Sequence, residues 1–127
     1  IKEGNDITIV AYSNMVNVVK EAIPAEELQD YSIELIDLQT VSPIDYDTIK
    51  NSLKKTKRRL VCQEAPSNSS VGTTVISKIV ESELFHELEV APKLVSGLHS
   101  PMPSAKHLEL NVIPQVEDIT NAVKSML

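Results

Sequence analysis

The chain has little of several residue types on which common functional sites depend. Its 127 residues include one cysteine, three glycines, three tyrosines, one phenylalanine and no tryptophan. A single cysteine, Cys62, excludes an internal disulfide framework and favours a reducing compartment: a mitochondrial matrix, a plastid or a bacterial cytoplasm. Gly4, Gly72 and Gly97 are too few and too scattered for a dinucleotide-binding fingerprint or a P-loop.

Basic stripes and long apolar runs are absent from the sequence as well. The net charge of −6 is spread along the chain, so the electrostatic pattern of a nucleic-acid binder is missing. The few aromatic residues offer no platform for stacking bases. Apolar residues make up 42% of the chain, but no window is long enough to cross a bilayer. We therefore expect neither a nucleic acid nor a membrane as partner.

The length fits one domain that covers residues 1–127. The chain opens at Ile1, without an initiator methionine and without a signal-peptide pattern. A strand-like segment begins soon after, at Asp6. These features predict a module of a longer polypeptide.

Strand and helix patterns alternate regularly along the chain. Short β-branched runs predict strands at 6–12, 32–38, 59–63 and 93–96. Strands separated by helices pair in parallel, so the pattern predicts an α/β fold, a three-layer αβα sandwich around a parallel sheet. The apolar positions expected to face the core are Met15, Val18, Val19 and Ala22, then Ile49 and Leu53, then Val75, Ile76, Ile79 and Val80, and finally Val116, Ile119, Val123 and Met126.

Capping and breaking residues place the helix ends. Ser13 or Asn14 precedes the first helix, Pro24 stops it, and Asp45 is placed to cap the second. The third is expected from about 71 to 85, and Pro114 at the first position of the last. The basic run 54–59 suggests a phosphate site, but cations in the last turn of a helix explain it better.

The histidines do not form a recognisable metal site. None of His86, His99 and His107 has the spacing of a zinc pair. His86 is expected on the surface at a helix end. His99 and His107 fall in an irregular segment, 97–113, where a role facing a substrate stays open.

No catalytic set emerges from the other reactive side chains. Cys62 lies mid-strand and is expected to be a buried small hydrophobe. The turn 67–70 lacks the glycines of a nucleophile elbow and is expected to be a solvated turn that caps a helix, with Gly72 packing that helix against a strand. Glu64, at a strand's carboxyl end, is placed as a general base would be, yet equally as a turn or interface residue. We predict no catalytic, cofactor or metal residue in this chain.

Four segments together resemble the C-terminal domain of the transketolase-like thiamine diphosphate enzymes, in particular the β subunit of the E1 component of 2-oxo acid dehydrogenases. The resemblance covers essentially the whole chain, and the proline-rich stretch 101–106 is similar to a loop of the pyruvate dehydrogenase type. Two departures, the glycine-poor turn 67–70 and Pro24, blur which 2-oxo acid the parent uses. The four segments are 6–12 (DITIVAY), 36–45 (IDLQTVSPID), 63–66 (QEAP) and 113–119 (IPQVEDI).

The resemblance implies a mixed five-stranded sheet whose first strand is antiparallel to the others. It also implies that thiamine diphosphate and Mg are bound in the parent enzyme between an α subunit and the β subunit's N-terminal pyrimidine-binding domain, which this chain lacks. The C-terminal domain then joins the α subunit and a second β subunit in an α2β2 assembly. It also contributes to docking of the acyltransferase (E2), for which Glu89 and Leu127 occupy the matching positions.

The parent reaction implied by the resemblance is the oxidative decarboxylation of pyruvate, with transfer of the acyl group to a lipoyl arm. A branched-chain 2-oxo acid dehydrogenase and another transketolase-like enzyme stay open as alternatives. So does a non-catalytic interaction module that kept the fold and lost the enzyme.

Overall fold

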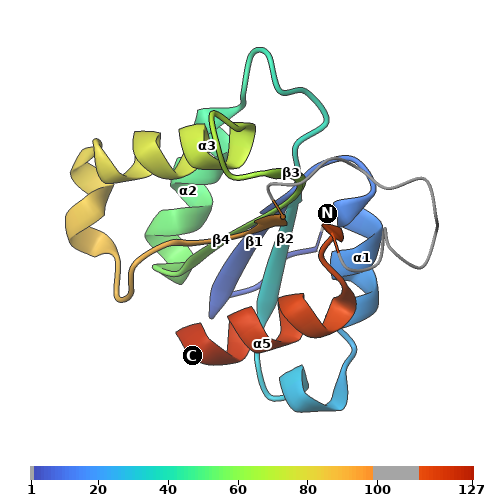
Figure 1. Cartoon of the computed structure of the whole chain (residues 1–127). Coiled ribbons are helices and arrows are strands. Elements are labelled where there is room, and N and C mark those ends of the chain that lie inside the picture. The colour runs from blue at the N-terminus through green and yellow to red at the C-terminus, as the bar shows by residue number, and fades with distance from the viewer. Residues whose placement is uncertain (1, 99–111) are drawn as a thin grey trace.

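The computed structural model describes residues 2–98 and 112–127, in which strands and helices alternate along the chain (Figure 1). Short 3₁₀ helices, labelled η, follow α1 and α3. The elements in chain order are β1 (Ile7–Ala11), α1 (Met15–Ala22), η1 (Glu26–Leu28), β2 (Ile33–Asp37), α2 (Tyr46–Thr56), β3 (Arg59–Pro66), α3 (Val71–Val80), η2 (Glu83–Glu87), β4 (Lys93–Gly97) and α5 (Val116–Met126).

Helices cover both faces of the central sheet (Figure 1). On one face, α1 and α5 pack against Ile7, Ile9 and Leu60, which are fully buried. On the other, α2, α3 and η2 enclose Val10 and Val61. Successive strand residues point to opposite faces, and both faces are covered, so the strands read as continuous apolar runs. The predicted three-layer α/β sandwich is confirmed.

The sheet of the described residues has four strands in the order β2-β1-β3-β4, all parallel. These four strands are parallel, as the residues alone predict; the mixed five-stranded sheet implied by the resemblance has the same fold class and differs from this part of the chain in strand count and in its antiparallel first strand. Antiparallel pairing occurs there at the isolated bridge between Lys2 and Leu35. It stops at once because the backbone N–H groups of Asn5 and Asp6 both turn to the carbonyl of Ser32.

Local sequence signals predict the start of α2 and the end of α1 correctly, but not the start of α5. Asp45 Oδ1 accepts a hydrogen bond from Thr48 N at 3.1 Å, so it caps α2 as predicted. The first helix ends at Ala22, before Pro24. The last begins at Val116, so Pro114 precedes its N-cap and is not its first residue. There Asp118 Oδ2 accepts from Gln115 N at 2.8 Å, which fixes the start two residues later than expected.

The third helix is shorter than predicted. It ends at Val80, and Ser82 caps the separate η2 by accepting a hydrogen bond from Leu84 N at 3.2 Å. Val80 is consequently 42% exposed and not inward-facing. In α1, Val16 is buried where Val18 was expected, and Val18 is only partly buried.

A buried polar row crosses the sheet near the amino ends of its strands. The register places Glu34 beside Thr8 and Thr8 beside Arg59, so all three side chains point toward α2. Thr8 Oγ1 lies 2.5 Å from Ser52 Oγ and 2.7 Å from Thr56 Oγ1. The row fixes α2 over the sheet through hydroxyl contacts.

The ends of this row carry opposite charges. Glu34 accepts hydrogen bonds from Lys55 and Ser52; burial raises the pKa of Glu34, but these bonds outweigh it and lower the pKa overall. Arg59 is fully buried, not a solvated helix-end cation as the sequence suggested. Its Nη2 donates to the carbonyl of Ile49 at 2.7 Å, and burial lowers the pKa of Arg59 to about 9.

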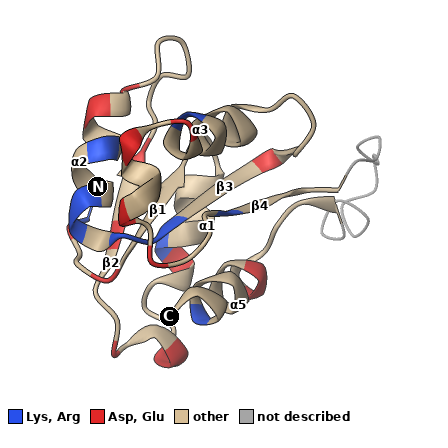
Figure 2. Ribbon diagram, turned by 90° about the vertical axis from the view of Figure 1, so that its left-hand side faces the viewer, with Lys and Arg blue, Asp and Glu red and all other residues tan. Residues whose placement is uncertain are grey.

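Charged residues of both signs are interleaved over the helices, α2 and α5 among them (Figure 2). Within the described residues, no helix combines the length and the apolar character needed to span a bilayer.

Candidate functional site

The carboxyl ends of β1 and β3 form the first candidate site. In an open α/β sheet, ligands bind where neighbouring strands send their chains to opposite sides. Here β1 continues to β2 on one side and β3 to β4 on the other, so this switch point lies between β1 and β3. It brings together Tyr12, Asn14, Gln63 and Glu64.

Gln63 uses its side chain to hold this edge together. Its Oε1 accepts from Gly72 N at 2.8 Å and from Tyr12 OH at 3.3 Å. Its Nε2 donates to the carbonyls of Ala65 and Pro66 at 3.1 and 3.0 Å. A Cβ on Gly72 would lie 2.5 Å from Gln63 Oε1, so close helix-to-strand packing explains this glycine, as expected. The amide is occupied in structural hydrogen bonds.

The hydrogen-bond partner of the Glu64 carboxylate is the side-chain amide of Asn14, which cannot relay a proton. Asn14 Nδ2 donates to Glu64 Oε1 at 3.3 Å. Burial, and then the charge of Glu64, raise the pKa of Tyr12, so the phenol stays protonated near neutral pH. The group therefore offers a carboxylate and a neutral phenol at a strand end, and Glu64 keeps the turn or interface interpretation beside that of a base.

The other reactive side chains do not join this group. Cys62 is buried, and burial raises the pKa of its thiol, so the predicted buried hydrophobe is confirmed. Ser70 accepts from Thr73 N at 3.2 Å and caps α3, as the turn 67–70 predicted. His86 lies in η2, with its ring 5.6 Å from that of Phe85. His99 and His107 lie outside the described residues.

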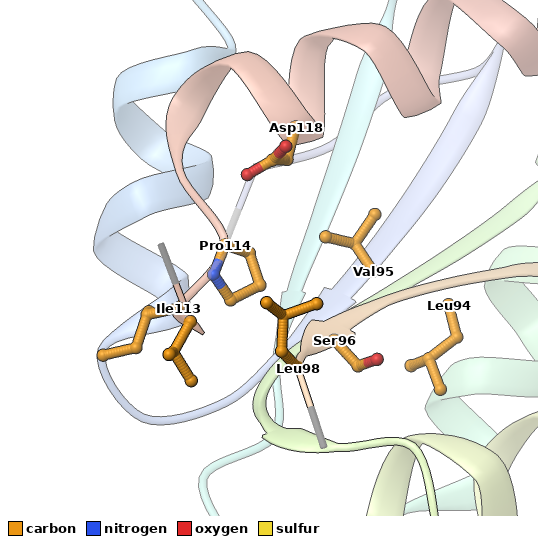
Figure 3. A pocket seen from close by; sticks show the side chains of 8 residues that line it. Leu94, Val95, Ser96, Leu98, Ile113, Pro114 and Asp118 are labelled. Atoms are coloured by element: carbon orange, nitrogen blue, oxygen red, sulfur yellow. The ribbon is translucent and has the colours of Figure 1, made fainter. Parts of the chain in front are cut away.

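A cavity of about 540 Å³ lies between β4 and the start of α5 (Figure 3). Most of the described residues that line it are apolar, and Ser96 and Asp118 are the members with polar side chains. Asp118 already accepts the N-cap hydrogen bond of α5, and no second carboxylate or histidine is among the described residues that line the cavity. These side chains do not provide an acid–base pair.

The second candidate site lies at the opposite end, where β3 and β4 begin. Glu89 Oε2 is 2.6 Å from Arg58 Nη2, and Glu89 N donates to the carbonyl of Lys57 at 3.1 Å. The sequence predicted Glu89 but not its partner. Arg58 directly precedes β3, and Glu89 comes just before β4, its parallel neighbour, so strand pairing is the signal that places the two side by side.

Leu127 lies at this same end of the molecule (Figure 1). Val90 and Leu127 pack against the same core cluster, and Lys93 Nζ donates to Ser125 Oγ at 2.6 Å, which ties β4 to the last turn of α5. The structure therefore places the two sequence-predicted partner-binding residues, Glu89 and Leu127, at the same end of the sheet. A cavity of about 250 Å³ lies beside Glu89, lined also by Phe85, Leu88, Val90 and Ala91.

Comparison with known proteins identifies the fold family. The family model described as "Transketolase, C-terminal domain" matches residues 1–119. The chain belongs to this family. A split-gene transketolase, solved as an inactive β4 tetramer, superimposes with a TM-score of 0.79 over 99% of this chain and 40% of its own, at 24% identity.

Relatives named as pyruvate dehydrogenase β subunits are more similar in sequence. The chain is 38% identical over 126 residues to the pyruvate dehydrogenase E1 component subunit beta of Rickettsia bellii, and 37% over 123 residues to the mitochondrial one of Pisum sativum. These alignments cover 99% and 97% of this chain but 38% and 34% of the relatives. The chain thus spans about a third of the length of these relatives.

The described residues do not fit the coenzyme that the family implies. Among them, no group of three or more histidine, cysteine, aspartate or glutamate side chains is placed to hold a metal ion. At the switch point, where a diphosphate would bind, Gln63 fills the space in front of Gly72 and Glu64 adds a negative charge. No step through thiamine diphosphate or Mg is therefore assigned to this chain.

Proposed function

We propose that the chain is the assembly and docking domain of the β subunit of a thiamine diphosphate-dependent 2-oxo acid dehydrogenase, of the pyruvate dehydrogenase type. The observation that carries this proposal is the 36–38% identity, along nearly the whole chain, to proteins named as pyruvate dehydrogenase β subunits. The hydrogen bonds of Gln63 support it, because they hold the carboxyl end of the sheet in structural contacts. The chemistry would then lie in other parts of the enzyme.

In the parent, pyruvate is decarboxylated oxidatively and the acetyl group passes to a lipoyl arm. Thiamine diphosphate and Mg would be held between the α subunit and the N-terminal domain of the β subunit. This domain would hold the α subunit and a second β subunit together. The work would take place in a mitochondrial matrix, a plastid or a bacterial cytoplasm; mitochondrial and bacterial relatives both occur.

Docking of the acyltransferase is assigned to the surface that carries Glu89 and Leu127. Glu89 is supported by its exposure of 46% and by the position of Leu127 at the same end. Arg58 occupies one carboxylate oxygen of Glu89, and a carboxylate has further acceptor sites for a cation of the partner.

The activity is tested with the full-length β subunit assembled with its α subunit. Turnover with pyruvate should exceed turnover with branched-chain 2-oxo acids. A preference for the branched-chain substrates would support the branched-chain alternative, and the absence of any 2-oxo acid decarboxylation would contradict the enzyme assignment. Capture of the acyltransferase by the same assembly tests the docking role.

The docking residue is tested by Glu89→Lys in that assembly. Lysine would repel a basic partner, so the dissociation constant for the acyltransferase should rise, while α2β2 assembly is retained and loss of the Arg58 pair costs no more than about 1 kcal/mol of stability. Glu21→Lys, an equal charge change at an exposed position of α1, is the matched control. Equal affinities for the two variants would remove Glu89 from the interface.

A further inference from the structure

The cavity beside Glu89 is an open apolar groove, here called the Phe85 groove and defined by Phe85, Leu88, Glu89, Val90 and Ala91. Phe85 is the one phenylalanine of the chain, and it is 49% exposed, more than any other large apolar residue among those described except Leu98. Aromatic residues exposed next to a hollow are typical of protein interfaces. The groove is therefore a candidate interface.

The size of the groove decides between two kinds of occupant. Pockets for cofactors and small ligands usually measure roughly 300–1,000 Å³ and enclose most of the ligand. The Phe85 groove measures about 250 Å³ and lies at the surface. It suits an apolar side chain of a protein partner better than a cofactor.

The walls of the groove are held in place before any partner arrives. Leu84, next to Phe85, is buried in the core, and Ser82 caps the helical turn that carries both. On the other wall, Glu89 is fixed twice, by Arg58 at 2.6 Å and by the carbonyl of Lys57 at 3.1 Å. Such preorganisation lowers the entropic cost of binding.

Charge around the groove selects the partner. The stretch 81–89 contains four glutamates and no lysine or arginine. Glu83 and Glu87 are exposed on the helical turn that carries Phe85. Arg58, paired with Glu89, and Lys57, whose carbonyl accepts from Glu89 N, bring two positive charges to these four glutamates. The charge of this group is therefore negative, which favours a cationic partner.

We propose that the Phe85 groove receives an apolar side chain of the acyltransferase, next to an arginine or lysine that bonds the second oxygen of Glu89. This inference rests on the docking role proposed above and adds to it a hydrophobic anchor. Anchors of this kind, packed in a pocket with charged groups at its rim, dominate the affinity of many interfaces. Arg58 is then a positioning residue that holds the Glu89 carboxylate at the edge of the groove.

The test measures affinity of the full-length α2β2 assembly for the acyltransferase by calorimetry at several salt concentrations. Phe85→Ala should weaken binding by about tenfold or more, as loss of an anchor does, with an unchanged salt dependence. Phe85→Leu should recover most of the affinity. Val41→Ala, at an apolar residue of similar exposure (45%) in the loop after β2, is the control and should bind like the wild type.

Each other outcome overturns a distinct claim. Wild-type affinity of Phe85→Ala, together with weakened Glu89→Lys, would contradict the anchor and leave docking at Glu89 intact. Loss of α2β2 assembly in Phe85→Ala, with the folded β subunit retained, would show that a subunit fills the groove and would also overturn the inference. Absence of binding by the wild-type assembly would contradict the docking function itself.

Discussion

The two ends of the parallel sheet use their polar side chains in different ways. The carboxyl end is where α/β proteins usually bind ligands. Here the side-chain amide of Gln63 is occupied by hydrogen bonds to backbone groups of residues 65, 66 and 72 and to Tyr12 OH. At the amino end, Glu89 and Phe85 stay half exposed although their backbone is fixed. In this domain, the end that usually carries chemistry maintains the fold, and the opposite end is the one that we propose for docking a partner.

The largest expected effect comes from disrupting α5, the helix that covers one face of the sheet together with α1. Val123 of α5 is fully buried against the sheet. Val123→Asp places an unpaired carboxylate in this core and should lower the free energy of unfolding by about 3–5 kcal/mol. Urea unfolding followed by circular dichroism measures the change, with Lys124→Gln as the exposed neighbour. A loss below about 1 kcal/mol would contradict the packing of α5.

Removing the amide of Gln63 tests whether the carboxyl end is structural. Gln63→Ala leaves the buried N–H of Gly72 without its acceptor and should cost about 1–3 kcal/mol of unfolding free energy. Glu64→Gln, at the next residue, should change it by less than about 0.5 kcal/mol. If Gln63→Ala kept full stability but abolished turnover of the assembled enzyme, the carboxyl end would be catalytic. That result would contradict the contrast drawn between the two ends of the sheet.

Acid should loosen the buried row at the amino ends of the strands. The folded-state pKa of Glu34 is lowered, so its contribution to stability is present above its ordinary value of 4.5 and is lost as the pH falls through the lowered pKa. Unfolding free energies measured from pH 6 downward should therefore fall more steeply for the wild type than for Glu34→Gln. Parallel curves for the two proteins would show that Glu34 is not held by Lys55 and Ser52.

The smallest effect is expected at the ion pair of the docking surface. Arg58 and Glu89 are both partly exposed, so a double-mutant cycle with Arg58→Met and Glu89→Gln should give a coupling of about 0–1 kcal/mol in stability. The same variants should change affinity for the acyltransferase more clearly than they change stability. A coupling above about 2 kcal/mol would make the pair a structural element, not a docking element.

Sequence patterns were sufficient where the deciding contacts are local. Asp45 and Ser70 cap helices through bonds to residues three positions later, and the apolar stripes of α2 and α5 follow from helical spacing. Ser82 carries a similar signal, and reading it would have ended α3 earlier.

Contacts between distant segments were beyond such patterns. Arg59 lies in a basic run, and only the register of β1 with β3 places it inside the fold beside Thr8. The ion pair of Arg58 with Glu89 depends in the same way on the pairing of β3 with β4. The antiparallel first strand, implied by resemblance, is reduced in the described residues to a bridge at Lys2, because the backbone turns toward Ser32.

The central claim is that this chain supports an active centre built from other parts and does not bind the coenzyme itself. Titration of thiamine diphosphate and Mg into the 127-residue chain by calorimetry tests it directly, after circular dichroism has verified that the chain is folded. The account predicts no binding heat above dilution, with binding restored in the full α2β2 assembly. Saturable binding to the folded domain alone would contradict it.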